Sequence, residues 1–106
     1  MTKTVETVAG PLDTGKLGTT LMHEHIINLS PDIQWSYANY HGWDPEVVIP
    51  QLRAALRRVK EGGIDTIVDM TVAGLGRDIH VVEQAVSGTG LQVIVATGMY
   101  IYNSLP

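Results

Sequence analysis

Hydrophobic residues recur along this chain with two alternating periods. Three short, nearly continuous apolar runs are typical of buried strands, at residues 17–27, 64–70 and 91–96. Between them, residues 45–61 and 79–86 carry apolar side chains at helical spacing. Apolar strands that alternate with amphipathic helices indicate a parallel sheet whose strands are joined by right-handed crossovers. The pattern therefore predicts a β-α-β-α-β unit of the α/β class.

Start and stop signals flank both predicted helices. Asp44 can cap the first helix, Pro45 suits its first position, and Gly62-Gly63 ends it. Asp78 can cap the second helix, which residues 87–90 bring to an end. The inner face of that helix is expected to carry Ile79, Val82, Ala85 and Val86.

The remaining segments are expected to be a hairpin and a long loop. Residues 4–9 alternate as a short strand, Gly10-Pro11 interrupts it, and residues 13–15 are a second turn signal. Residues 28–43 show neither period, and a loop of this length in a compact domain is usually functional. Two folds use such parallel units, the doubly wound open sheet and the eight-fold TIM barrel.

Composition narrows the functional classes. The 106 residues are 44% hydrophobic and 17% charged, as in globular proteins. Seven Lys and Arg residues and a net charge of −4 argue against a nucleic-acid partner. Cysteine is absent, which excludes disulfides and thiolate chemistry. No signal peptide or membrane-length apolar run is visible, so we expect a cytoplasmic protein with no membrane partner.

The most informative motif is His23-Glu24-His25, near the end of the first long strand. On a regular strand, alternate side chains share a face, so both imidazoles point one way and Glu24 points the other. Two imidazoles at this spacing can reach one metal ion. Parallel α/β enzymes build their sites at this end of the strands. Two histidines that only form hydrogen bonds at a strand end are an equally good interpretation.

Other polar residues are weaker candidates. Glu24 is expected to be a structural carboxylate hydrogen-bonded to backbone or helix, rather than a general base. Asp69 ends the second strand, where it could serve a site or, slightly better supported, cap the following loop. His41 and His80 are expected to be surface or packing residues. Gly74-Leu75-Gly76 lacks the dinucleotide fingerprint and predicts a turn.

Two tyrosines follow the third strand. Tyr100 and Tyr102 could line a pocket at its C-terminal end or simply pack under a loop. No residue is assigned a catalytic role from the pattern alone.

Five segments follow one another in a recognisable order: Gly10-Pro11-Leu12, residues 17–25 (LGTTLMHEH), residues 66–69 (TIVD), residues 74–79 (GLGRDI) and residues 96–102 (ATGMYIY). Together they resemble the phosphotriesterase family, particularly its phosphotriesterase-like lactonases. The resemblance extends from about Val5 to Pro106. This family implies a TIM barrel, of which residues 1–106 are expected to form the first β-α-β-α-β portion after a short N-terminal hairpin.

The resemblance also implies a function. His23 and His25 would bind the more buried of two divalent ions, most readily zinc, with iron, cobalt or manganese as alternatives. A bridging hydroxide would attack a lactone, of the acyl-homoserine lactone type, or an organophosphate ester. Tyr100 would border the lactone pocket. The complete protein is expected to be a homodimer.

The family's remaining metal ligands are expected beyond Pro106, since Lys3, Lys16 and Lys60 are not placed to bridge two ions. The barrel needs about 250 residues. We therefore expect this chain alone to be inactive, to bind metal weakly and to aggregate through exposed strand edges. A non-catalytic β-α-β scaffold for binding or self-assembly is the alternative function. A flavodoxin-like domain is disfavoured because a phosphate loop is missing.

Overall fold

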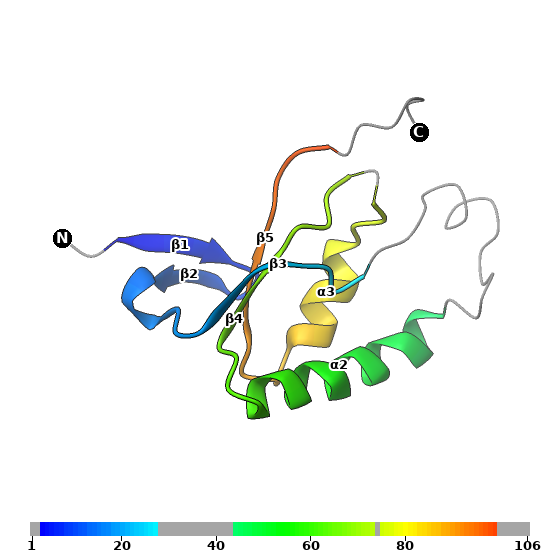
Figure 1. Ribbon diagram of the computed structural model, residues 1–106. Helices are drawn as coiled ribbons and strands as arrows, with labels where there is room; N and C mark the ends of the chain where they lie inside the picture. Colours follow the sequence, from blue (N-terminus) through cyan, green and yellow to red (C-terminus); the bar gives the residue numbers. More distant parts are fainter. Residues whose placement is uncertain (1–2, 28–43, 74, 100–106) are drawn as a thin grey trace.

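The computed structural model describes residues 3–27, 44–73 and 75–99. Within them, a hairpin precedes a β-α-β-α-β unit, as the sequence predicts (Figure 1). The elements are β1 (Thr4–Thr7), β2 (Gly10–Asp13), the 3-10 helix η1 (Thr14–Lys16), β3 (Thr20–Glu24), α2 (Pro45–Glu61), β4 (Thr66–Asp69), α3 (Ile79–Val86) and β5 (Gln92–Val95). The loop expected at residues 28–43 lies outside the described residues.

β3, β4 and β5 form a parallel sheet with β4 in the centre. Thr66 of β4 aligns with Thr20 of β3 on one side and with Gln92 of β5 on the other, so the three strands start at the same level. Because parallel strands share their direction, their carboxyl ends also meet at one edge. This edge is where the sequence predicts the site.

The hairpin of β1 and β2 is antiparallel and separate from this sheet. The backbone N–H of Val8 donates to the carbonyl of Val93 at 2.8 Å, which joins the hairpin to β5. Gly10 and Pro11 begin β2 instead of interrupting the chain between strands, and the turn falls two residues earlier, at Val8 and Ala9. Proline is tolerated there because an edge strand leaves some N–H positions unpaired.

Both helices begin and end where the sequence predicts. The Asp44 carboxylate accepts a hydrogen bond from the Glu46 N–H at 3.0 Å, and Pro45 occupies the first turn of α2. Gly62 caps the C-terminus of α2. The Asp78 carboxylate accepts from the Val81 N–H at 3.2 Å and so caps α3. These side chains satisfy N–H groups that a helix start leaves without partners.

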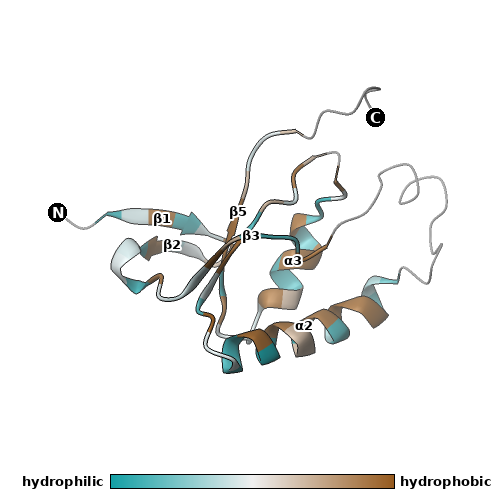
Figure 2. Ribbon diagram, in the orientation of Figure 1, coloured by the Kyte–Doolittle hydropathy of each residue, from teal (hydrophilic) through white to brown (hydrophobic). Residues whose placement is uncertain are grey.

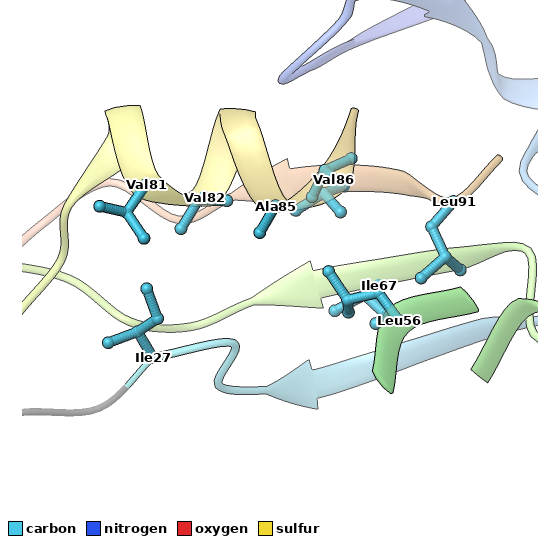
Figure 3. Packing of buried hydrophobic residues seen from close by; sticks show 9 residues of the cluster. Ile27, Leu56, Ile67, Val81, Val82, Ala85, Val86 and Leu91 are labelled. Carbon is cyan, nitrogen blue, oxygen red and sulfur yellow. The ribbon is translucent and has the colours of Figure 1, made fainter. Parts of the chain in front are cut away.

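The hydrophobic core lies between the two helices and one face of the sheet (Figure 3). It consists of Ile27, Leu56, Ile67, Val81, Val82, Ala85, Val86, Leu91 and Val93. The prediction that Ile79 faces the core is wrong, since Ile79 is 39% exposed and Val81 is buried in its place. At 100° per residue, Ile79 lies roughly 90° from the middle of the buried stripe and in the first turn of α3.

The hydropathy of the elements matches their burial (Figure 2). Three of the four residues of β5 are apolar, whereas α2 alternates polar and apolar surfaces, as expected for a helix that covers a sheet on one side. α2 and α3 also contact each other. None of the helices in the described part of the chain is long and apolar enough to span a bilayer.

Candidate functional site

His23 and His25 lie at the carboxyl end of β3. The strand is shorter than the predicted run, so His23 is its penultimate residue and His25 follows its last residue, Glu24. The ring centroids of the two histidines are 5.4 Å apart, with an interplanar angle of 70°. Two imidazoles that bind one tetrahedral zinc ion through nitrogen at about 2.0–2.1 Å have centroids about 5 Å apart. The rings are therefore close enough to share one ion.

A β-bulge near the end of β3 changes how this pair is presented. Leu21 pairs with Ile67 and Glu24 pairs with Asp69, so three steps along β3 match two steps along β4. Ile67 and Asp69 share a face of β4, and the bulge therefore places Leu21 and Glu24 on that same face.

The regular alternation assumed from the sequence is wrong at this point. Unbroken alternation would put His23 on the face of Leu21, which packs against the helices and the core. The extra residue places His23 instead on the opposite face of the sheet, where it is exposed. Bulges next to active sites commonly redirect side chains in this way.

The two imidazoles have different surroundings. His25 is half-buried, and its Nδ1 lies 2.9 Å from the hydroxyl oxygen of Thr71. His23 is exposed, and no hydrogen bond to its ring is formed within the described residues. In His25, Nε2 is the ring nitrogen left for a metal ion. Imidazole nitrogen suits zinc and related divalent metals, so this donor pair fits the metal that the family resemblance implies.

Glu24 ends β3, and its register with Asp69 puts it on the face of Leu21. With Leu21 and residues of α2, including Leu52 and Leu56, it borders a cavity of about 310 Å³ on the helix side of β3. His25 and Ile26 also border this cavity. The hydrogen bond predicted for the Glu24 carboxylate is not formed within the part of the chain that the structure describes.

Asp69 ends β4, and its side chain is fully buried. One carboxylate oxygen, Oδ1, accepts from the Thr71 N–H at 3.0 Å. The other, Oδ2, is buried without a hydrogen-bond partner among the described residues. Asp69 thus caps the start of the loop, as one interpretation predicted, and it also holds the residue that contacts His25.

Thr71 is the residue that the sequence analysis did not single out. It is 1% exposed and lies two residues beyond β4. Threonine is common in strands and loops, and only the pairing of β3 with β4 brings it to His25. No local signal in the sequence identifies it.

None of the other candidate residues that the structure describes lies beside His23 and His25. His80 is exposed in the first turn of α3, as predicted. The Leu75 N–H donates to the Val72 carbonyl at 3.0 Å, which agrees with a turn at Leu75-Gly76. His41, Gly74, Tyr100 and Tyr102 lie outside the described residues. Across the described ranges, no three His, Asp or Glu side chains are grouped to hold a metal.

Comparison with known proteins identifies the family. The sequence model of the phosphotriesterase family matches residues 3–105. A phosphotriesterase homology protein of Mycobacterium tuberculosis is 42% identical over 102 residues, which cover 96% of this chain and 31% of that protein. An aryldialkylphosphatase of Saccharolobus solfataricus is 38% identical over 98 residues, which cover 90% of this chain and 30% of that protein. The chain therefore spans about a third of the length of these relatives.

A more distant relative is the N-acetyltaurine hydrolase of Rattus norvegicus. It is 25% identical over 122 residues, which cover 92% of this chain and 35% of that protein. The first two relatives are named for phosphoester substrates and the third for N-acetyltaurine, so the names of the relatives do not agree on one substrate.

The fold agrees with that of a solved relative. The structure of the phosphotriesterase from Mycobacterium tuberculosis matches with a TM-score of 0.89 and 41% sequence identity. The match covers 98% of this chain and 32% of that one. The predicted fold class, a hairpin followed by the first β-α-β-α-β portion of a TIM barrel, is confirmed. Since the family's sequence model and this structure both match nearly the whole chain, the chain belongs to the phosphotriesterase family.

Proposed function

We propose that the full-length protein containing this chain is a metal-dependent hydrolase of lactones, with organophosphate triesters as further substrates. One observation carries the proposal: the imidazoles of His23 and His25 lie together at the carboxyl end of β3, 5.4 Å apart, on a bulge that redirects His23. Family membership favours this enzymatic hypothesis over a non-catalytic scaffold.

In this proposal, His23 and His25 hold one of two divalent ions, with zinc as the first choice. A bound divalent ion lowers the pKa of water and polarises the substrate's carbonyl or phosphoryl oxygen. This chain supplies two neutral imidazole donors, of which His25 is already fixed by Thr71. The fully buried Asp69 holds the backbone of Thr71 through the hydrogen bond from the Thr71 N–H.

The organophosphate part of the proposal follows from the more similar relatives. Relatives at 42% and 38% identity are named for phosphotriester chemistry, whereas the N-acetyltaurine hydrolase is 25% identical. The lactone preference rests on the residues 96–102 segment that the sequence shares with phosphotriesterase-like lactonases. Tyr100 is proposed to border the acyl pocket. The homodimer and the cytoplasmic location remain predictions from sequence.

The test is metal removal and reconstitution of the full-length protein. Hydrolysis is measured on an acyl-homoserine lactone, an aryl dialkyl phosphate and N-acetyltaurine, before chelation, after it and after zinc is returned. We expect the lactone to be the best of the three substrates. Chelation should abolish the activity, and zinc should restore it.

Three variants assign the metal to this site. Outer partners of metal ligands contribute about 10–100-fold to activity, so removing a direct ligand should cost more. We expect His23→Asn and His25→Asn each to lower activity by more than about 100-fold. His80→Asn, an exposed histidine of α3, is the matched control and should retain activity. Full activity and full metal content in both site variants would overturn the proposal.

A further inference from the structure

The contact between His25 and Thr71 joins residues that are 46 positions apart in the sequence. It is the one side-chain hydrogen bond that reaches either histidine of the pair within the described residues. Thr71 is 1% exposed, so water does not compete for its hydroxyl. A buried hydroxyl beside a half-buried imidazole is a fixed partner, whereas a surface hydroxyl could turn away.

The backbone on both sides of this contact is held in place. Thr71 donates its N–H to Asp69 Oδ1 at 3.0 Å. The preceding residue, Met70, donates its N–H to the carbonyl of Glu24 at 2.8 Å, and Glu24 directly precedes His25. The carbonyl of Asp69 accepts from the Ala96 N–H at 3.0 Å, which ties the same turn to β5. The two residues before Thr71 are therefore hydrogen-bonded to the chain at the ends of both neighbouring strands, and Thr71 is held to the first of them, Asp69.

Resting on the proposed function, we infer that Thr71 is a positioning residue that selects the metal-binding tautomer of His25. Its hydroxyl oxygen accepts a hydrogen bond from Nδ1–H of His25. The proton then resides on Nδ1, and the lone pair of Nε2 is directed to the ion. Metal-ligating histidines generally have the other ring nitrogen hydrogen-bonded, because this fixes both the tautomer and the ring orientation.

The two histidines consequently have different tasks. His25 is oriented before the metal arrives, whereas His23, exposed and without a ring partner among the described residues, becomes oriented by the ion itself. Asp69 acts on His25 only indirectly, because it holds the backbone N–H of Thr71. Metal affinity should therefore depend on the hydroxyl of Thr71 although that hydroxyl touches neither metal nor substrate.

The test compares Thr71→Val, Thr71→Ser and Thr66→Val in the full-length protein. Thr66 is the matched control because it is also fully buried in the β4 segment, and its hydroxyl donates to the Leu17 carbonyl at the other end of the strand. Zinc affinity is measured by competition with a chelator. The visible spectrum of the cobalt-substituted protein reports the ligand geometry.

We expect Thr71→Val to weaken zinc binding by about 10–100-fold and to alter the cobalt spectrum. Thr71→Ser, which keeps the hydroxyl, should restore most of the affinity and the original spectrum. Thr66→Val should leave both unchanged even if it lowers stability. Because a purely structural role would affect the two valine variants alike, this pattern is specific to positioning.

A second measurement needs no variant and so does not depend on folding. Nitrogen-15 NMR of the metal-free full-length protein at mildly alkaline pH identifies which ring nitrogen of His25 carries the proton. The Nδ1–H tautomer supports the inference, and the Nε2–H tautomer overturns it.

Failure of this inference differs from failure of the proposed function. If His25→Asn weakens zinc binding and Thr71→Val does not, the positioning role is wrong while the histidine site stands. If His25→Asn leaves zinc binding unchanged, His25 is not a ligand and both proposals fall.

Discussion

The two ends of the parallel sheet differ in the polar side chains that they hold, although each end buries one side-chain oxygen without a partner among the described residues, Gln92 Oε1 at the amino end and Asp69 Oδ2 at the carboxyl end. At the amino end, the Asp65 carboxylate accepts from the Thr19 N–H at 3.0 Å and from Lys60 at 2.8 Å. The Thr66 hydroxyl donates to the Leu17 carbonyl there. At the carboxyl end, His23 is exposed and Asp69 Oδ2 has no partner among the described residues.

This difference suggests that the amino ends of the three strands contribute to stability and that their carboxyl ends hold the proposed metal site. The amino end is a network between the chain entering β3, the end of α2 and the start of β4. At the carboxyl end, the exposed imidazole of His23 and Nε2 of His25 are the groups that the proposed metal site would use. In TIM-barrel enzymes the sites are built at the carboxyl ends, and the opposite end serves stability. Substitutions at the amino end should therefore change stability and leave metal binding intact.

The largest effect on stability is expected from Gly18→Ala. Gly18 has a φ of 65°, and a Cβ there would collide with the Asp65 carboxylate that accepts from Thr19. Backbone strain together with displacement of Asp65 should cost about 2 kcal/mol. Urea denaturation of the full-length protein measures this change. Zinc affinity should remain that of the wild type, and a parallel loss of zinc binding would contradict the separation of the two ends.

A smaller loss is expected from Thr66→Val. The substitution keeps the shape of a fully buried side chain but removes the donor to the Leu17 carbonyl. An unmade hydrogen bond of this kind should cost about 1–2 kcal/mol. Denaturation compares this variant with Thr89→Val, which removes another buried hydroxyl bond, to the Val86 carbonyl at the end of α3. Unchanged stability in Thr66→Val would show that the Leu17 contact contributes little.

The smallest effect concerns acid stability. The hydrogen bond from Lys60, then the N–H of Thr19 and the charge of Lys60, lower the pKa of Asp65 below its usual value. Because the folded pKa is the lower one, the stabilisation is present above the unfolded pKa of about 3.9 and is lost as pH falls through the folded pKa. The pair is partly exposed, at 36% for each side chain, so solvent screening keeps the effect small.

Asp65→Asn should therefore flatten the decline of stability below about pH 4. Denaturation midpoints at several pH values measure the slope, and Glu61→Gln, an exposed carboxylate at the end of α2, is the control. If stability still declined with falling pH as steeply in Asp65→Asn as in the wild type, the Asp65 carboxylate would not contribute to the loss of stability in acid.

The sequence was sufficient for most of the fold because its signals are local. Asp44, Asp78 and Gly62 cap their helices as predicted, and each apolar run contains its strand. The positions where the structure differs from the prediction depend on neighbours that are distant in the sequence. The bulge in β3 arises from its register with β4, and the facing of α3 that buries Val81 depends on how the helix sits on the sheet.

The candidate site, like the fold, was predictable where its signal is local and not where it depends on strand pairing. His23 and His25 stand out as a short motif, but the contact of His25 with Thr71 depends on two strands that the sequence keeps 46 residues apart. Nothing in the residues around Thr71 marks its hydroxyl as different from that of Thr66. Pairing of strands, and not residue type, gives Thr71 its position.

The most direct test of the two-histidine site is anomalous diffraction from crystals of the zinc-loaded full-length protein, recorded on both sides of the zinc absorption edge. We expect an anomalous peak about 2.0–2.1 Å from one nitrogen of His23 and from Nε2 of His25. A zinc peak bound elsewhere, with both imidazoles outside its coordination sphere, would contradict the site.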